Sequence, residues 1–113
     1  NGTAPAIDLL PKDVVICDWH YERADKTPVY LATKWFSVIT CTWNRPAVAI
    51  QQVKDMHEFR SSATEKMKER YLGIMQTVWS DAGKFMAEYY TNATPTPDQR
   101  SPAQAFRATF KSE

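Results

Sequence analysis

Residues 14–22 read VVICDWHYE, and this stretch sets the interpretation of the whole chain. The run from Asp13 to Asp18 is rich in valine and isoleucine, which is typical of a buried β-strand. Without an intervening glycine turn, the run then passes into a tryptophan, a histidine, a tyrosine and a glutamate. A strand that ends in aromatic and ionisable side chains predicts either a ligand site or an aromatic cap over the core.

The other elements follow from apolar runs and from residues that start helices. Two more β-rich runs predict strands, and proline or a capping residue marks most of the helix starts. The predicted strands are 36–42 and 72–78. Three longer helices are predicted: one over 28–34 after a Thr27 cap, one from Pro46 to the break at Ser61-Ser62, and one over 102–110. A short exposed helix is predicted within 63–70. A further helix is predicted after Ser80-Asp81, and its apolar face holds Phe85, Met86, Tyr89 and Tyr90.

The order of these elements predicts a single α/β unit over residues 1–113. It has a lead-in at 1–12, a polar loop at 91–100 and a terminal helix at 101–113. Apolar strands that alternate with helices form βαβ units, so we expect three parallel strands with both faces of the sheet covered.

Composition argues against several classes of protein. The formal net charge is +1, from 14 basic and 13 acidic residues, and no basic stripe indicates a nucleic-acid binder. No apolar run is long enough for a membrane span. We expect no cofactor, because the three glycines are isolated, and no metal, because His20 and His57 lack fellow ligands. Cys17 and Cys41 are interpreted as small buried hydrophobes rather than a disulfide.

A repeat connects the three predicted strands. Each ends in a tryptophan that polar residues follow, namely Trp19, Trp43 and Trp79. Because the carboxyl ends of parallel strands lie on one rim of a sheet, we expect the three indoles to meet in space. Indole rings among hydrogen-bonding groups suit a sugar, which has apolar C–H faces and hydroxyl edges. Trp35 precedes a strand and is assigned to packing.

The strand ends also carry a family resemblance. DWHYE after PKDVVI, TWN after FSVIT, and LGIMQTVWS together resemble the last three βα units of family 20-type glycoside hydrolases, the β-N-acetylhexosaminidase-like group. The resemblance implies part of a (β/α)8 barrel that acts on terminal N-acetylhexosamine-type sugars. Trp19 and Trp79 match the family's sugar-enclosing tryptophans, and Trp43 with Asn44 matches a polar contact site. The resemblance also implies a periplasmic or secreted protein.

The sequence departs from that family in the catalytic pair. The family's adjacent Asp-Glu pair belongs to the end of strand four, and no adjacent Asp-Glu occurs among these 113 residues. Three strands also cannot close a barrel that takes eight. We therefore expect the chain to be the carboxyl-terminal piece of a longer enzyme, with catalysis outside it.

The ionisable residues after the first strand are candidate contacts rather than catalysts. Asp18 and Glu22 could form a glycosidase carboxylate pair, but residues four apart at the end of one strand seldom span a scissile bond. The predicted contacts are therefore Asp18, His20 and Asn44 beside the tryptophans, and Glu22 is expected to be a solvated loop residue. The alternative hypothesis is a self-standing, non-catalytic binding or assembly module that self-associates through open sheet edges.

Overall fold

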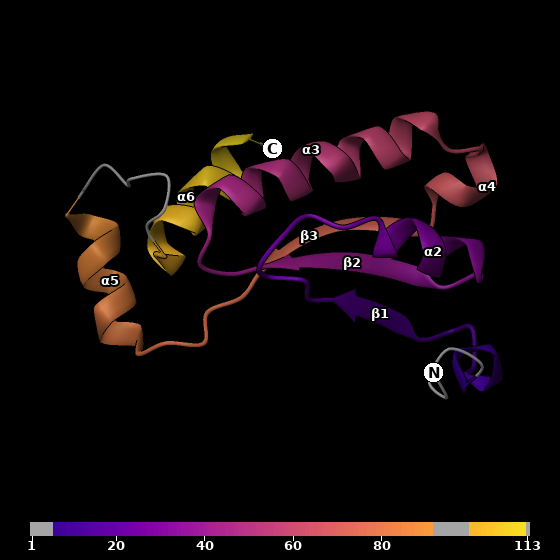
Figure 1. Cartoon of the computed structure of the whole chain (residues 1–113), viewed down its shortest axis with the longest axis horizontal. Coiled ribbons are helices and arrows are strands. Elements are labelled where there is room, and N and C mark those ends of the chain that lie inside the picture. The colour runs from indigo at the N-terminus through magenta and orange to yellow at the C-terminus, as the bar shows by residue number, and fades with distance from the viewer. Residues whose placement is uncertain (1–5, 92–99, 113) are drawn as a thin grey trace.

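The computed structural model describes residues 6–91 and 100–112, with the side chain of Ser112 left out. It contains a three-stranded parallel sheet of order β1-β2-β3, with helices between the strands and a helix at the carboxyl end (Figure 1). The elements are η1 (Ile7–Leu9), β1 (Val15–Asp18), α2 (Thr27–Thr33), β2 (Ser37–Thr42), α3 (Pro46–Ser62), α4 (Glu65–Lys68), β3 (Tyr71–Gln76), α5 (Ala82–Tyr90) and α6 (Pro102–Ser112).

The predicted α/β class and element order are confirmed, with small differences in bounds. β1 begins at Val15 rather than Asp13, and β3 runs from Tyr71 to Gln76 rather than from Leu72 to Val78. The charged segment 63–70 holds only the single helical turn α4. Residues 1–5 of the lead-in and 92–99 of the loop lie outside the described residues.

Two of the three predicted helix caps are confirmed. The Asp81 side chain accepts a hydrogen bond from the backbone N–H of Gly83, and the Ser101 hydroxyl accepts one from the N–H of Gln104. Thr27 is not a cap, because α2 already includes it and Lys26 occupies the position before the helix. Pro28 sits in the first turn, where its missing N–H costs no hydrogen bond.

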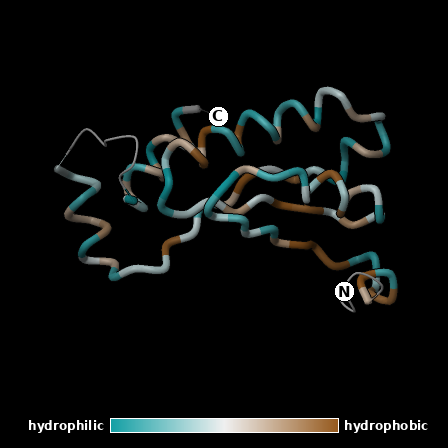
Figure 2. Tube along the Cα trace, in the orientation of Figure 1, coloured by the Kyte–Doolittle hydropathy of each residue, from teal (hydrophilic) through white to brown (hydrophobic). Residues whose placement is uncertain are grey.

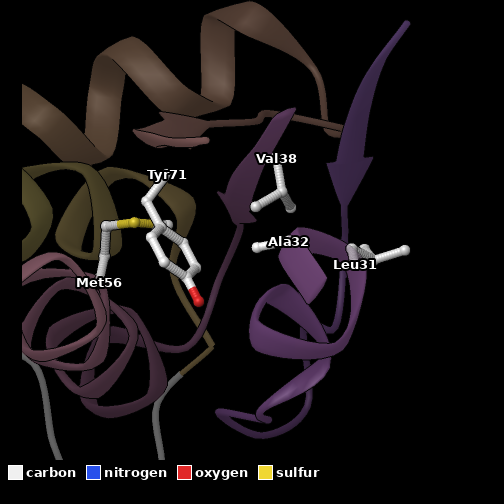
Figure 3. Close-up of a cluster of buried hydrophobic side chains, with 5 residues drawn as sticks. All are labelled: Leu31, Ala32, Val38, Met56 and Tyr71. Carbon is white, nitrogen blue, oxygen red and sulfur yellow. The ribbon is translucent and has the colours of Figure 1, made fainter. Parts of the chain in front are cut away.

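The hydrophobic core lies between the sheet and helices α2 and α3. Leu31 and Ala32 of α2 and Met56 of α3 pack against Val38 of β2 and Tyr71 of β3 (Figure 3). The strand register places Ile16 of β1 and Ile74 of β3 on this same face, and both pack against the cluster. Both helices therefore cover one face of the sheet.

The opposite face of the sheet corrects the expectation of two covered faces. Its side chains include Val15, which is 50% exposed, Met75, which is 45% exposed, and Cys17, which is exposed rather than buried as predicted. Connections between parallel strands are nearly always right-handed, so two steps in one direction along the sheet put both helices on one side. In the described part of the chain, no helix lies over Val15, Cys17 and Met75.

Figure 2 colours the same trace by hydropathy, and it shows apolar segments along the strands and a mixture of polar and apolar residues along the helices. Cys41 on the central strand is 3% exposed, as predicted for it.

The longest helix, α3, has 17 residues and carries several charges. Over residues 6–91 and 100–112, none of the helices combines the length and apolarity needed to cross a membrane.

Trp35 ends α2 in a backbone conformation that usually requires glycine. Its φ is 72°, its N–H donates to the Ala32 carbonyl, and the next N–H, of Phe36, donates to the Leu31 carbonyl. This pair of bonds is the Schellman motif. The indole is 51% exposed and stacks under the guanidinium of Arg70, 4.9 Å from the ring centroid. Its packing therefore involves a surface cation rather than the core.

Strand β3 contains a bulge at Leu72 and Gly73. The register shifts between Val38 and Ile39 of β2, whose partners are Tyr71 and Gly73, so that Leu72 is an extra residue in β3. Such a bulge needs a residue that tolerates positive φ, and Gly73 has a φ of 130°. Because of this extra residue, Ile74 points to the same helix-covered face of the sheet as Tyr71.

Candidate functional site

The aromatic residues at the carboxyl ends of the strands meet around Tyr21. The ring centroid of Tyr21 lies 5.7 Å from that of Trp19 and 5.5 Å from that of Trp43. Both ring pairs are tilted, a geometry that aromatic quadrupoles favour. Tyr21 is in the loop after β1, and Trp43 follows β2. The phenol ring therefore bridges the ends of two neighbouring strands.

Trp79 reaches the same tyrosine by a hydrogen bond. Its indole Nε1 donates to the phenol oxygen of Tyr21 at 2.8 Å and lies 3.1 Å from the hydroxyl oxygen of Thr77. The Thr77 hydroxyl donates in turn to the backbone carbonyl of Thr42 at 2.7 Å. The three tryptophans are thus brought together as predicted, although each contacts Tyr21 rather than another indole.

Two of the three indoles are open to solvent. Trp19 is 67% exposed and Trp79 is 70% exposed, whereas Trp43 is half-buried. A cap over the hydrophobic core would bury its rings. The exposure of Trp19 and Trp79 is therefore the property that separates this arrangement from simple core packing.

Gln76, the last residue of β3, fixes the backbone beneath this aromatic group. Its amide nitrogen donates to the carbonyl of Trp43 at 2.7 Å and to that of Thr77 at 2.9 Å. Its amide oxygen accepts from the hydroxyl of Thr42 at 2.5 Å. The side chain therefore ties the end of β3 to the end of β2, which positions Trp43 beside Tyr21.

Asp18 and His20 form a pair behind Trp19. The imidazole Nδ1 lies 2.6 Å from a carboxylate oxygen of Asp18, which is 6% exposed. Burial raises the pKa of Asp18 above its ordinary range, against the lowering effect of His20. The amide of Gln52 on α3 also donates to the backbone carbonyl of His20. His20 is thereby held at two points, and its ring remains 45% exposed.

Asn44 lies under the rim with an unsatisfied side chain. It is 8% exposed, and its backbone carbonyl accepts a hydrogen bond from the N–H of Ser101. Among the described residues, neither its side-chain oxygen nor the buried indole nitrogen of Trp43 has a hydrogen-bond partner. Unsatisfied buried polar atoms are costly, and Gln52 Oε1 and Arg45 Nε share this property.

Glu22 has different partners from Asp18. Its carboxylate forms an ion pair with the guanidinium of Arg45 and lies 3.6 Å from that of Arg100. The side chain is 61% exposed, in agreement with a solvated loop residue. Asp18 therefore pairs with an imidazole, whereas Glu22 pairs with guanidinium groups.

A hollow of about 470 Å³ lies beside the rim and is lined by residues 19–23. A smaller one of about 230 Å³ is lined by residues 16–20. Trp19 and His20 line both, whereas Trp43 and Trp79 line neither. Within the described ranges, no group of three or more histidine, cysteine, aspartate or glutamate side chains has a geometry that could hold a metal ion.

Tyr21, Thr77 and Gln76 are functional candidates that the sequence pattern did not single out. The repeat drew attention to the tryptophans, and these three residues have no equivalents at the other strand ends. The available signal was the position of Tyr21 two residues beyond Trp19, inside the polar segment that follows β1.

No family model matches the chain, and a search of the curated proteins gives no match.

Proposed function

We propose that this chain is the carboxyl-terminal part of a glycoside hydrolase that acts on terminal N-acetylhexosamine-type sugars. In this proposal Trp19, Tyr21 and Trp79 form a stacking surface for the sugar, and His20 and Asn44 supply polar contacts. The catalytic acid pair lies outside these 113 residues. The proposal rests on the resemblance of the strand ends and, above all, on two highly exposed indoles joined through one tyrosine.

The chemistry of a pyranose suits this surface. An exposed indole covers the C–H face of the ring, and the neighbouring imidazole and amide can bond its hydroxyls.

The uncovered sheet face supports the idea of a larger parent domain. Parallel sheets occur almost only with both faces covered, yet Val15, Cys17 and Met75 are exposed here. Further strands of a barrel would cover that face and would pair with the open edges of β1 and β3. A second copy of the chain could also cover that face and pair with those edges. The exposed face therefore also supports the alternative, a self-associating module without catalysis.

Tryptophan fluorescence during titration with N-acetylglucosamine tests the proposal. We expect saturable quenching in the unaltered chain and a weaker response in Trp19→Phe. Trp35→Phe is the matched control, because Trp35 is 51% exposed but lies at the other end of the strands. The chain should not hydrolyse a chromogenic N-acetylglucosaminide. No quenching at high sugar concentration, together with a concentration-dependent dimer in sedimentation, would favour the assembly module.

A further inference from the structure

A cavity of about 420 Å³ lies on the helix-covered side of the sheet, away from the tryptophans. We call it the α2–α3 cavity, because these two helices form its walls, and α4 and β3 each contribute one lining residue. Its lining residues are Lys26, Val29, Thr33, Asp55, Glu58, Phe59, Ser62, Ala63, Met67 and Tyr71. Its volume falls in the range of pockets that bind small molecules, and its lining mixes apolar side chains with charged and hydroxyl-bearing ones.

Tyr71 contributes a phenol hydroxyl to the lining of this cavity. The residue is 4% exposed, and its ring lies beside Met56 with the hydroxyl group directed toward the helices rather than the sheet (Figure 3). Residues 6–91 and 100–112 offer this hydroxyl no hydrogen-bond partner. Burial raises the pKa of Tyr71, so the phenol stays protonated and is available as a donor. Tyr71 lines the cavity, so an acceptor bound in the cavity could take the hydrogen bond of its hydroxyl.

Charged side chains surround the mouth of the cavity. Asp55 and Glu58 are three residues apart on α3, so they share one side of that helix. One oxygen of Asp55 accepts a hydrogen bond from Gln51, and in the described part of the chain the Glu58 carboxylate has no partner. Lys26 contributes a single positive charge from the opposite wall. Two carboxylates against one ammonium give the mouth a net negative charge, which favours a cation over an anion.

We propose that the α2–α3 cavity binds a small amine with an apolar, ring-sized body and a hydrogen-bond acceptor at its inner end. The acceptor takes the hydroxyl of Tyr71, the ring lies among Val29, Phe59 and Met67, and the ammonium pairs with Asp55 and Glu58. This site is independent of the sugar proposal, because it shares no residue with the group around Tyr21.

Three matched probes separate the parts of this inference. 4-Acetylbenzylamine carries the acceptor, the ring and the ammonium. 4-Isopropylbenzylamine has nearly the same shape without the acceptor, and 4-acetylbenzoate reverses the charge. Titration calorimetry or saturation-transfer NMR with the 113-residue chain should rank the first probe above the other two. No binding of 4-acetylbenzylamine at millimolar concentration, or tighter binding of the benzoate, would overturn the proposal.

Variants then test the named side chains. Tyr71→Phe should weaken 4-acetylbenzylamine about three- to tenfold, the usual effect of one hydrogen bond, and should leave the isopropyl analogue unchanged. Glu58→Gln should weaken both amines, whereas Asp13→Asn, at an exposed position away from the cavity, should weaken neither. Equal effects of Tyr71→Phe on the two amines would contradict the assignment. If Tyr71→Phe does not fold, as judged by circular dichroism, the comparison of probes in the unaltered chain decides the question.

Discussion

The indole nitrogen of Trp79 donates a hydrogen bond to the phenol oxygen of Tyr21 at 2.8 Å, across 58 residues of sequence. This contact connects the loop after β3 to the loop after β1, which lie at opposite edges of the sheet. Trp43, from the strand between them, packs on the same tyrosine. Tyr21 therefore contacts all three indoles, although its own side chain is only half-buried.

Tyr21→Phe should release Trp79 while leaving the aromatic contacts in place. We expect faster motion of Trp79 in time-resolved fluorescence anisotropy and a stability loss of about 0.5–1 kcal/mol, because the lost bond is partly exposed. Tyr30→Phe is the control, since Tyr30 is 44% exposed and lies on α2. An unchanged anisotropy decay in Tyr21→Phe would show that the hydrogen bond does not hold the indole.

Gly73→Ala should destabilise the chain by about 1–2 kcal/mol, because a residue with a Cβ is strained at a φ of 130°. Space is not the reason, since an added Cβ would meet nothing within 4 Å. Urea unfolding measures the effect. Gly83→Ala is the matched control, because Gly83 lies in a helix and its Cβ would make ordinary contacts with Asp81 at 3.6 Å or more. That control should be neutral or stabilising by up to about 1 kcal/mol. Equal losses in both variants would contradict the assignment of strain to Gly73.

Asp18 should make stability fall as the pH rises through the acidic range. Burial raises the pKa of Asp18 above its ordinary value of 3.8, although His20 lowers it in part. The folded chain therefore holds this proton more tightly than the unfolded chain. Asp18 contributes no penalty below pH 3.8, a growing one as the pH rises through its folded-state pKa, and the full penalty above that point.

Urea unfolding of Asp18→Asn at a series of pH values tests this sign. The variant should lack the part of the decline that Asp18 causes, whereas Asp13→Asn, at an exposed position, should keep it. A steeper decline in Asp18→Asn than in the unaltered chain would mean that the pairing with His20 outweighs burial.

The two cysteines should differ sharply in reactivity. Burial, followed by the nearby Cys17 thiol, raises the pKa of Cys41 to about 11, whereas Cys17 is exposed. We expect iodoacetamide near neutral pH to label Cys17 first and to label Cys41 only after unfolding, because the thiolate is the reactive form. Mass spectrometry of the labelled chain reads this out, and folded Cys17→Ser should take up almost no label. Rapid double labelling of the folded chain would show that Cys41 is accessible.

Much of the fold could be predicted, because its signals are local. The β-branched runs before Trp19 and Trp43 mark strands whatever surrounds them, and Asp81 and Ser101 act as caps through their own backbone neighbours. The exposure of Cys17 could not be predicted in this way. It depends on β1 being an edge strand whose second face stays uncovered, and the alternation of residues within β1 carries no information on either point.

The gathering of the three tryptophans could be predicted from the sequence, whereas the tyrosine between them could not. Trp19, Trp43 and Trp79 follow strands, so the parallel sheet alone fixes where they gather. Tyr21 stands in a loop, where no periodicity gives the direction of a side chain. Its contacts depend on Thr77 and Gln76, which only the register of β3 brings within reach.

The residues around Tyr21 contribute nothing to the cluster of Leu31, Ala32, Val38, Met56 and Tyr71 on which the core is built. Substitutions at Trp19 or Trp79 therefore leave the main source of folding energy intact. A lineage carrying this fold can therefore exchange those aromatic side chains one at a time at little risk of unfolding. The fold thus allows the rim residues to change in sequence while the core residues are kept.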